Sequence, residues 1–262
     1  MVRRGVSATR AEAAQAIRSG KVVVGGRPAV KASTMVLPEE PIALTDPARR
    51  FVSRGGDKLD AALARFGLDV SGRTALDAGA STGGFTDCLL SRGAERVIAV
   101  DVGYGQLDWR LREDPRVIVL ERTNVRDLQP DAFPRAPEVV TADLAFISLR
   151  QVLPALARCA APDADIIALV KPQFEAGRDE VGKGVVADPS VWERVLGSIA
   201  TAFASEGLDV LGVMASPLLG PAGNVEFFIY GRGSTGPRSS RHEERFIDAA
   251  IEEAVGLVST HR

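Results

Sequence analysis

From residue 73 onward, short apolar runs alternate with longer stretches in which apolar residues recur every three to four positions. The apolar runs predict strands, and they read RTALDA, RVIAVDV, RVIVLE, EVVTADL and DIIALVK. The periodic stretches predict helices, and they read TGGFTDCLLSRG, LDWRLRED, SLRQVLPALARCA and PSVWERVLGSIATAFASEG. Strands that alternate with helices are typical of an α/β domain with a mostly parallel sheet covered on both faces.

Further elements flank this alternating region. A helix is predicted before it in GDKLDAALARFG, and an antiparallel strand pair after it in LDVLGVMASPL and NVEFFIYGR. The segment GRGSTGPRSS has the composition of a linker. Ser240 and Glu243 then form a capping-box pattern, and a last helix is predicted whose apolar face consists of Phe246, Ile247, Ala250, Ile251, Ala254 and Val255.

The first 45 residues predict a separate, small α+β unit. Thr9 and Glu12 form a capping box for a helix that Gly20 ends. KVVV and RPAVKAS flank the turn pair Gly25-Gly26 as a hairpin, and MVLPEEPIAL supplies one or two more extended pieces. A unit of this size holds little core, so we expect it to lean on a neighbour or on its ligand. Residues 46–54 are interpreted as a linker and residues 55–262 as the second domain.

Charge distinguishes the two domains. The chain has a net charge of −2, but residues 1–35 carry seven basic side chains against one acid, Glu12. Basic patches favour polyanions, because phosphate neutralisation with counterion release drives nucleic-acid binding. The alternative is a solvated face that happens to be basic. The candidate RNA-binding residues are Arg3, Arg4, Arg10, Arg18, Lys21, Arg27 and Lys31, with Arg54 from the linker.

Composition limits the remaining classes. In 262 residues, 45% are hydrophobic and 25% charged, as in ordinary globular proteins. No apolar run approaches the roughly 18 residues of a membrane span, and the start lacks the apolar core of a signal peptide, so we expect a cytoplasmic protein. Cys88 and Cys159 are far apart and are interpreted as small core residues. The two histidines, His242 and His261, lie in the C-terminal tail, so we expect neither histidine catalysis nor a metal site.

A glycine-rich turn follows the first strand of the second domain, in ALDAGASTGGFTDCLL. Such a turn lets backbone amides approach a ligand closely. Gly79 is followed by three other residues before Gly83-Gly84, which departs from the GxGxxG dinucleotide fingerprint and fits an adenosylmethionine loop better. Asp77 can serve as an acid near the positive sulfonium, directly or through the loop, and Asp101 ends the next strand, where a carboxylate accepts ribose hydroxyls. The alternative is a structural turn with two capping aspartates.

Four charged residues stand in apolar or strand-terminal settings: Lys58, Asp143, Lys171 and Glu226. Ligands of open α/β sheets bind beyond the carboxyl ends of strands, where Asp143 and Lys171 fall. A buried lysine is costly, so two lysines beside two carboxylates predict a compensated polar cluster in a cleft. Such a cluster suits methyl transfer to an alcohol, because a lysine can take the hydroxyl proton or stabilise the alkoxide. The alternative is a set of structural ion pairs.

The combined motifs resemble the TlyA family of ribosomal RNA 2'-O-methyltransferases, also called haemolysin A. The matching segments are SRGGDKLDAAL, ALDAGASTGGFTDCLL, VIAVDVGYGQLDWRLR, TADLAFISL, LVKPQFEAG and NVEFFIYG. The resemblance implies an S4-like RNA-binding domain at residues 1–45 and an FtsJ-like, Rossmann-like class I methyltransferase domain. It places the family's catalytic tetrad on Lys58, Asp143, Lys171 and Glu226. It implies S-adenosyl-L-methionine binding by Asp77, Gly79, Ser81, Thr82, Gly83, Gly84, Phe85 and Asp101.

The chain departs from the family pattern at two places. An S4 domain usually opens with an additional helix, whereas this sequence begins almost at the second and is N-terminally short. The family usually carries a basic residue where Ala187 stands, and Lys183 is expected to compensate.

Three functions follow as hypotheses. The first is methylation of a ribose 2'-hydroxyl in ribosomal RNA or a ribosomal subunit, with cytidine implied by the resemblance and Lys171 as the base, supported by Lys58. The second is a non-catalytic RNA-binding or ribosome assembly factor, which would have no need to keep the costly lysines. The third, a membrane-active haemolysin, conflicts with an acidic last helix that carries Glu243, Glu244, Asp248, Glu252 and Glu253.

Overall fold

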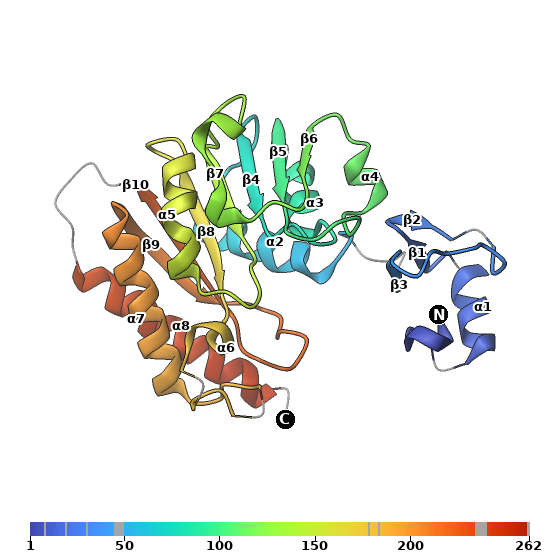
Figure 1. The fold of residues 1–262 in the computed structure, drawn as a ribbon. Helices are drawn as coiled ribbons and strands as arrows, with labels where there is room; N and C mark the ends of the chain where they lie inside the picture. Colours follow the sequence, from blue (N-terminus) through green and yellow to red (C-terminus); the bar gives the residue numbers. More distant parts are fainter. Residues whose placement is uncertain are drawn as a thin grey trace.

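The computed structural model describes residues 1–262 except 8, 19, 30, 45–49, 178, 183, 234–239 and 261–262. The described residues form a three-stranded sheet near the N-terminus and a seven-stranded sheet in the rest of the chain (Figure 1). The larger sheet is mostly parallel and flanked by helices, which confirms the predicted α/β class.

The N-terminal unit consists of η1 (Val2–Arg4), α1 (Arg10–Arg18), β1 (Val22–Val24), β2 (Arg27–Pro28) and β3 (Ile42–Leu44). The Glu12 amide donates to Thr9 Oγ1, as the capping box predicts, and β1 pairs antiparallel with both β2 and β3. Of MVLPEEPIAL only Ile42–Leu44 forms a strand. Arg4 instead holds the preceding turn by donating to the carbonyls of Leu37 and Glu40, and the prolines of this segment have no N–H for a ladder.

The large sheet has the strand order β6-β5-β4-β7-β8-β10-β9. Five of its strands are parallel: β4 (Thr74–Ala78), β5 (Arg96–Val100), β6 (Val117–Leu120), β7 (Val139–Ala142) and β8 (Asp165–Val170). β10 (Phe227–Gly233) runs antiparallel to both β8 and β9 (Leu208–Ala215), which confirms the predicted terminal pair. From β4 the chain builds outward to β6 and then returns to β7. Ligands of such sheets bind at this switch point, beyond the carboxyl ends of β4 and β7.

Helices cover both faces of this sheet. α2 (Arg54–Phe66) and α3 (Gly84–Ser91) pack on one face, and α5 (Leu149–Cys159), α7 (Pro189–Ser205) and α8 (Ser240–Thr260) pack on the other. Shorter helical segments are α4 (Trp109–Arg112), η2 (Val125–Asp127), η3 (Pro130–Ala132) and α6 (Pro172–Glu175). The sequence pattern missed α6, a single turn that Pro172 begins. Each face has its own apolar core. Cys88 and Cys159 are buried core residues, as predicted, and they lie in different cores.

The N-terminal unit leans on the larger domain, as its size predicts. The carbonyl of Gly26, in the hairpin turn, accepts a 3.0 Å hydrogen bond from the Trp109 amide at the start of α4. A Cβ atom on Gly26 would lie 2.6 Å from the Leu107 carbonyl oxygen, so a side chain here would separate the two units.

Candidate active site

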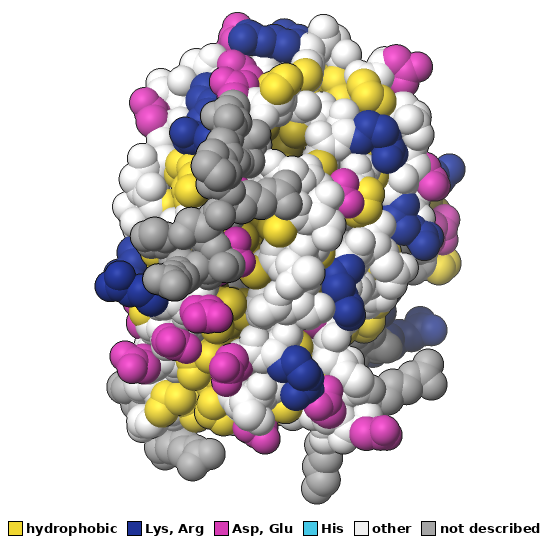
Figure 2. All heavy atoms as spheres, turned by 90° about the vertical axis from the view of Figure 1, so that its left-hand side faces the viewer, with side chains coloured by type: hydrophobic (Ala, Val, Ile, Leu, Met, Phe, Trp, Pro, Cys, Tyr) yellow, Lys and Arg dark blue, Asp and Glu magenta, His cyan; other side chains and the backbone are white. Residues whose placement is uncertain are grey.

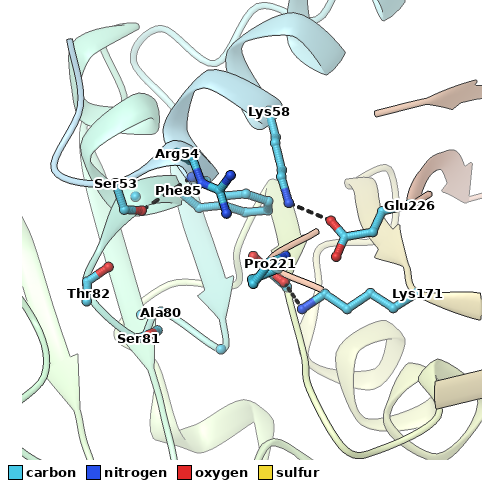
Figure 3. A pocket seen from close by; sticks show the side chains of 14 residues that line it. Ser53, Arg54, Lys58, Ala80, Ser81, Thr82, Phe85, Lys171, Pro221 and Glu226 are labelled. Atoms are coloured by element: carbon cyan, nitrogen blue, oxygen red, sulfur yellow. Dashed lines mark hydrogen bonds and ion pairs between the residues drawn. The ribbon is translucent and has the colours of Figure 1, made fainter. Parts of the chain in front are cut away.

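A cavity of about 270 Å³ opens at the carboxyl ends of β4, β7 and β8, at the predicted switch point (Figure 3). It is lined by the N-terminus of α2, the glycine-rich loop after β4, the first residues after β7 and β8, and the segment before β10. The lining residues are Ser53, Arg54, Gly55, Lys58, Gly79, Ala80, Ser81, Thr82, Gly84, Phe85, Asp143, Lys171, Pro221 and Glu226.

The glycines of the loop after β4 are sterically required. Gly79 has a φ of +88°, and a Cβ atom on it would lie 2.4 Å from the Asp143 carbonyl oxygen. A Cβ atom on Gly84 would lie 2.2 Å from Ser53 Oγ. The bare backbone therefore lets the loop pass close to both the end of β7 and the start of α2. This leaves the cavity side of the loop open, so the loop fits a cofactor held by backbone groups.

Asp77 supports this loop from below. Its side chain is fully buried, and Thr86 Oγ1 donates to Oδ2 over 2.6 Å. Burial raises the pKa of Asp77 to about 7, and the nearby charges of Asp143 and Asp101 act in the same direction, while the Thr86 bond opposes them. Oδ1 has no hydrogen-bond partner in the described part of the chain. Asp77 therefore shapes the loop from within the core rather than from the cavity wall.

Asp101 holds the loop from its other side. Its Oδ2 accepts the Ser81 amide over 2.8 Å, and its Oδ1 accepts the Gly103 amide over 2.6 Å. Ser81 has a φ of +49°, an uncommon conformation for a residue with a side chain. The Asp101 carboxylate, directly after β5, thus keeps the Ser81 backbone in place, and its contact to the ribose of the cofactor stays a prediction.

Two ion pairs face the cavity. Lys58 Nζ on α2 lies 2.5 Å from Glu226 Oε2, and Lys171 Nζ after β8 lies 2.5 Å from Asp143 Oδ1 after β7. The first pair is the more buried, with side chains 8% and 1% exposed, against 14% and 26% for the second. Figure 3 shows both lysine amines pointing toward the same space. Each ammonium is compensated by one carboxylate, and the more exposed Lys171 is the more accessible to a substrate.

The segment before β10 places Glu226 through backbone contacts. The Glu226 carbonyl accepts the Ser216 amide, and a Cβ atom on Gly220 would lie 2.6 Å from Glu226 Oε1. Buried Asn224 accepts the Val186 amide and donates to the Gly184 carbonyl, which ties this segment to the loop before α7. The absence of a side chain at Gly220 and the two hydrogen bonds of the Asn224 amide therefore fix the position of the Glu226 carboxylate beside Lys58.

The structure gathers all four tetrad candidates around one cavity, together with Gly79, Ser81, Thr82, Gly84 and Phe85. Among the described residues, the cavity lining does not include Asp77, Gly83 or Asp101; Gly83, with a φ of +97°, is the N-cap of α3. Arg54, expected to contact RNA, lines the cavity itself. Four further lining residues were not predicted from the sequence: Ser53, Gly55, Ala80 and Pro221. Of these, Pro221 had a signal in the turn-rich PLLGPAGN before Glu226. Lys183 lies outside the described residues.

The fold, the loop and the charged cavity define the class of protein as a Rossmann-like methyltransferase. The model of the FtsJ-like methyltransferase family matches residues 51–233, and the S4 domain model matches residues 1–42. The chain is 52% identical to the 16S/23S rRNA (cytidine-2'-O)-methyltransferase TlyA of Mycobacterium tuberculosis, over 97% of this chain and 96% of the relative. It belongs to the TlyA family of FtsJ-like methyltransferases, which confirms the resemblance, and S-adenosylmethionine is its methyl donor.

Two further relatives carry the haemolysin name. Hemolysin A of Brachyspira hyodysenteriae is 35% identical over 86% of this chain and 95% of its own length. A solved structure from Streptococcus thermophilus, also named as a hemolysin, is 38% identical with a TM-score of 0.76, and the match covers 95% of this chain and 92% of that one. The name therefore occurs within a family whose fold is that of a methyltransferase.

Proposed function

We propose that this protein methylates a cytidine ribose 2'-hydroxyl of ribosomal RNA. The observation that carries the proposal is the pair of lysine–carboxylate contacts around the cofactor-loop cavity, with Lys171 at its more open side. The cytidine and the ribosomal substrate are supported by the name of the 52% identical relative. A ribosomal substrate also supports the proposal that the protein works in the cytoplasm.

In this proposal, each tetrad residue has a role. Bound adenosylmethionine supplies an electrophilic methyl group on a sulfonium. Lys171 acts in its uncharged form: Nζ accepts the proton of the ribose hydroxyl as the oxygen attacks the methyl group, and Asp143 orients that amine at 2.5 Å. Lys58, held by Glu226, stabilises the oxygen while it carries negative charge. The cavity walls align the hydroxyl with the methyl donor, and this alignment supplies much of the remaining rate.

RNA is proposed to be held first by the S4-like unit at residues 1–45, joined by residues 46–54 to the catalytic domain at residues 55–262. The proposed contacts are the basic residues of that unit, together with Arg54 at the cavity. In the structure, Arg3, Arg10, Arg27 and Lys31 are exposed. Arg4 is exposed too, although its guanidinium also donates to two backbone carbonyls. Arg18, Lys21 and Arg54 complete the basic set.

The test is methyl transfer from labelled adenosylmethionine to ribosomal subunits isolated from cells that lack the protein. We expect label on one ribose 2'-oxygen, and a loss of roughly 10²- to 10⁴-fold in rate for Lys171→Ala, because a positioned general base contributes about that much. Cofactor affinity measured by calorimetry should change little in this variant. Normal turnover by Lys171→Ala would overturn the assignment of the base.

The same experiment separates the alternative functions. Cofactor binding without any labelled RNA would favour a non-catalytic RNA factor. A membrane-lytic role has little physical support: among the described residues, no helix is both long and apolar enough to cross a membrane. The face that carries α7 and α8 intermixes acidic and basic side chains rather than presenting a cationic surface (Figure 2).

A further inference from the structure

Two loops that carry tetrad residues are fastened to each other beyond the cavity. Asp143 and Lys171 follow the adjacent parallel strands β7 and β8, which are hydrogen-bonded up to the pair Ala142 and Ala168. Five residues after Asp143 the chain reaches Ser148, the N-cap of α5, and four residues after Lys171 it reaches Glu175, the last residue of α6. Both loops therefore diverge from the sheet and meet again at the start of α5.

The junction is a buried carboxylate. Glu175 has a side chain only 3% exposed, and its two oxygens accept from different groups of the other loop. Oε2 accepts the Ser148 hydroxyl over 2.5 Å, and Oε1 accepts the Leu149 amide over 2.6 Å. The rings of Phe146 and Phe174, one from each loop, contact each other with centroids 5.1 Å apart. Glu175 thus bridges the loops at a second point besides the Asp143–Lys171 pair.

Glu175 also fills an electrostatic need of α5. The first turn of this helix, all of whose residues are described, carries no acidic side chain. A carboxylate at a helix N-terminus is favourable, and here it comes from α6 rather than from α5 itself. Arg150 adds to the junction, since its guanidinium donates to the Glu175 carbonyl oxygen over 3.3 Å. One side chain therefore caps a helix and ends the loop that begins at Lys171.

We propose that Glu175 is a positioning residue for methyl transfer, which holds the loop after β8 against the start of α5 so that Lys171 stays aligned with Asp143. The proposal rests on the tetrad assignment made above. The two loops are joined at both ends. The pairing of β7 with β8 joins them at the sheet, and the Glu175–Ser148 hydrogen bond joins them at the start of α5. Loss of the contact frees a four-residue segment that leads directly to the base.

The test compares Glu175→Gln and Glu175→Ala with the parent enzyme in single-turnover methyl transfer to ribosomal subunits at saturating cofactor. Glutamine keeps an acceptor for one donor but presents an N–H₂ group to the other, and alanine removes both acceptors. We expect the rate constant to fall about 10-fold for glutamine and on the order of 100-fold for alanine, because small misplacements of a reacting group cost this much. The Kd for adenosylmethionine should stay within about twofold, since the cofactor loop belongs to other strands.

Ser148→Ala provides the partner measurement. If Glu175 acts through this junction, the rate of the double variant Ser148→Ala/Glu175→Ala should match that of Glu175→Ala alone. Asp114→Asn is the matched control: this carboxylate also accepts a backbone amide and a guanidinium, both from Arg116, but it lies before β6, an edge strand that is separated from β7 by β5 and β4. Its turnover should equal that of the parent at temperatures well below unfolding.

Each outcome decides the proposal. Parent-like rates in folded Glu175→Gln would overturn it, as would a loss of cofactor affinity that parallels the loss of rate. If Glu175→Ala fails to fold by circular dichroism, the glutamine variant decides alone. Lys171→Ala run in parallel separates the two proposals, because activity in that variant contradicts the tetrad assignment, whereas an inactive Lys171→Ala beside a fully active Glu175→Gln contradicts only the role of Glu175.

Discussion

The two ends of β8 carry charged side chains that are used in opposite ways. At its amino end, Asp165 is 1% exposed and accepts from Arg73, Tyr230 and Arg232, each over 2.7 Å. At its carboxyl end, Lys171 contacts one carboxylate and borders a cavity. At the amino end, three donors surround the Asp165 carboxylate. At the carboxyl end, Lys171 and Asp143 pair with each other and leave open space beside them.

The pKa directions express the same contrast. Burial opposes ionisation of Asp165, but the hydrogen bonds from Arg232, Tyr230 and Arg73 outweigh burial and lower its pKa. Asp77, near the site, is buried and accepts hydrogen bonds from Thr86, but burial outweighs them and raises its pKa to about 7. A charged side chain whose hydrogen bonds are fully satisfied therefore marks the stabilising cluster. Charged side chains that are only partly compensated, beside a cavity, mark the site. The burial of a charged side chain alone does not distinguish a stabilising cluster from an active site.

The largest effect expected at the saturated end comes from Asp165→Asn. The substitution removes the negative charge and turns an amide N–H₂ toward guanidinium donors. We expect a loss of about 3 kcal/mol in the free energy of unfolding, at the lower end for a broken buried pair because both arginines reach solvent. Urea unfolding at pH 7 measures it.

Methyl transfer well below the unfolding temperature should stay within about twofold of the parent for Asp165→Asn, since the cluster lies at the edge of the sheet opposite the cavity. Lys171→Ala should show the reverse, with activity lost and stability nearly kept. A variant of Asp165 that is fully stable, or that loses turnover while folded, would contradict the division of roles between the two ends.

Much of this contrast could be predicted from the sequence. The strand–helix alternation gave the sheet, and strand ends placed Asp143 and Lys171 at one edge, because parallel strands align their carboxyl ends. Lys58 and Glu226 were singled out by their settings, but local patterns do not show that these two residues pair, since their contact joins α2 to the segment before β10 across 168 residues. The Asp165 cluster was missed, because nothing in DIIALVK reveals that Arg232 pairs opposite it in the antiparallel register.

Other features could not be read from local patterns. The sequence left open whether Asp77 acts on the cofactor directly or through the loop, because the pattern of β4 does not show that its side chain points into the core toward Thr86. The role of Glu175 depends on α6, a single turn too short to produce a periodic signal. The sequence alone therefore does not predict the tertiary contacts that short elements make.

The next effect concerns pH and Asp77. Because its pKa in the folded state, about 7, exceeds the unfolded value near 4, the folded protein keeps a proton that the unfolded chain releases. Stability is therefore greatest below pH 4 for this group, falls as pH rises from about 4 to 7, and stays lower above 7. Asp77→Asn cannot ionise, so its free energy of unfolding relative to the parent should rise by about 2 kcal/mol between pH 5 and pH 8.

Asp165 titrates in a separate window with the opposite sign. Its lowered pKa gives stability that is present above the unfolded value near 4 and is lost as pH falls through the folded value. The difference in free energy of unfolding between each variant and the parent, measured from pH 5 to 8, should therefore change with pH only for Asp77→Asn. A flat difference for that variant would show that Asp77 is ionised throughout this range.

The smallest effect comes from deleting one hydroxyl at each buried carboxylate. Tyr230→Phe removes one of several donors to Asp165, which is ionised from pH 5 to 8, so we expect a constant cost of about 1 kcal/mol. Thr86→Val removes the donor to Asp77 Oδ2, and the cost should be about 1 kcal/mol larger at pH 8, where the carboxylate is charged, than at pH 5. Equal pH dependence in the two variants would mean that Asp77 and Asp165 share one kind of environment, and the incomplete compensation of charge near the cavity would then not extend beneath the cofactor loop.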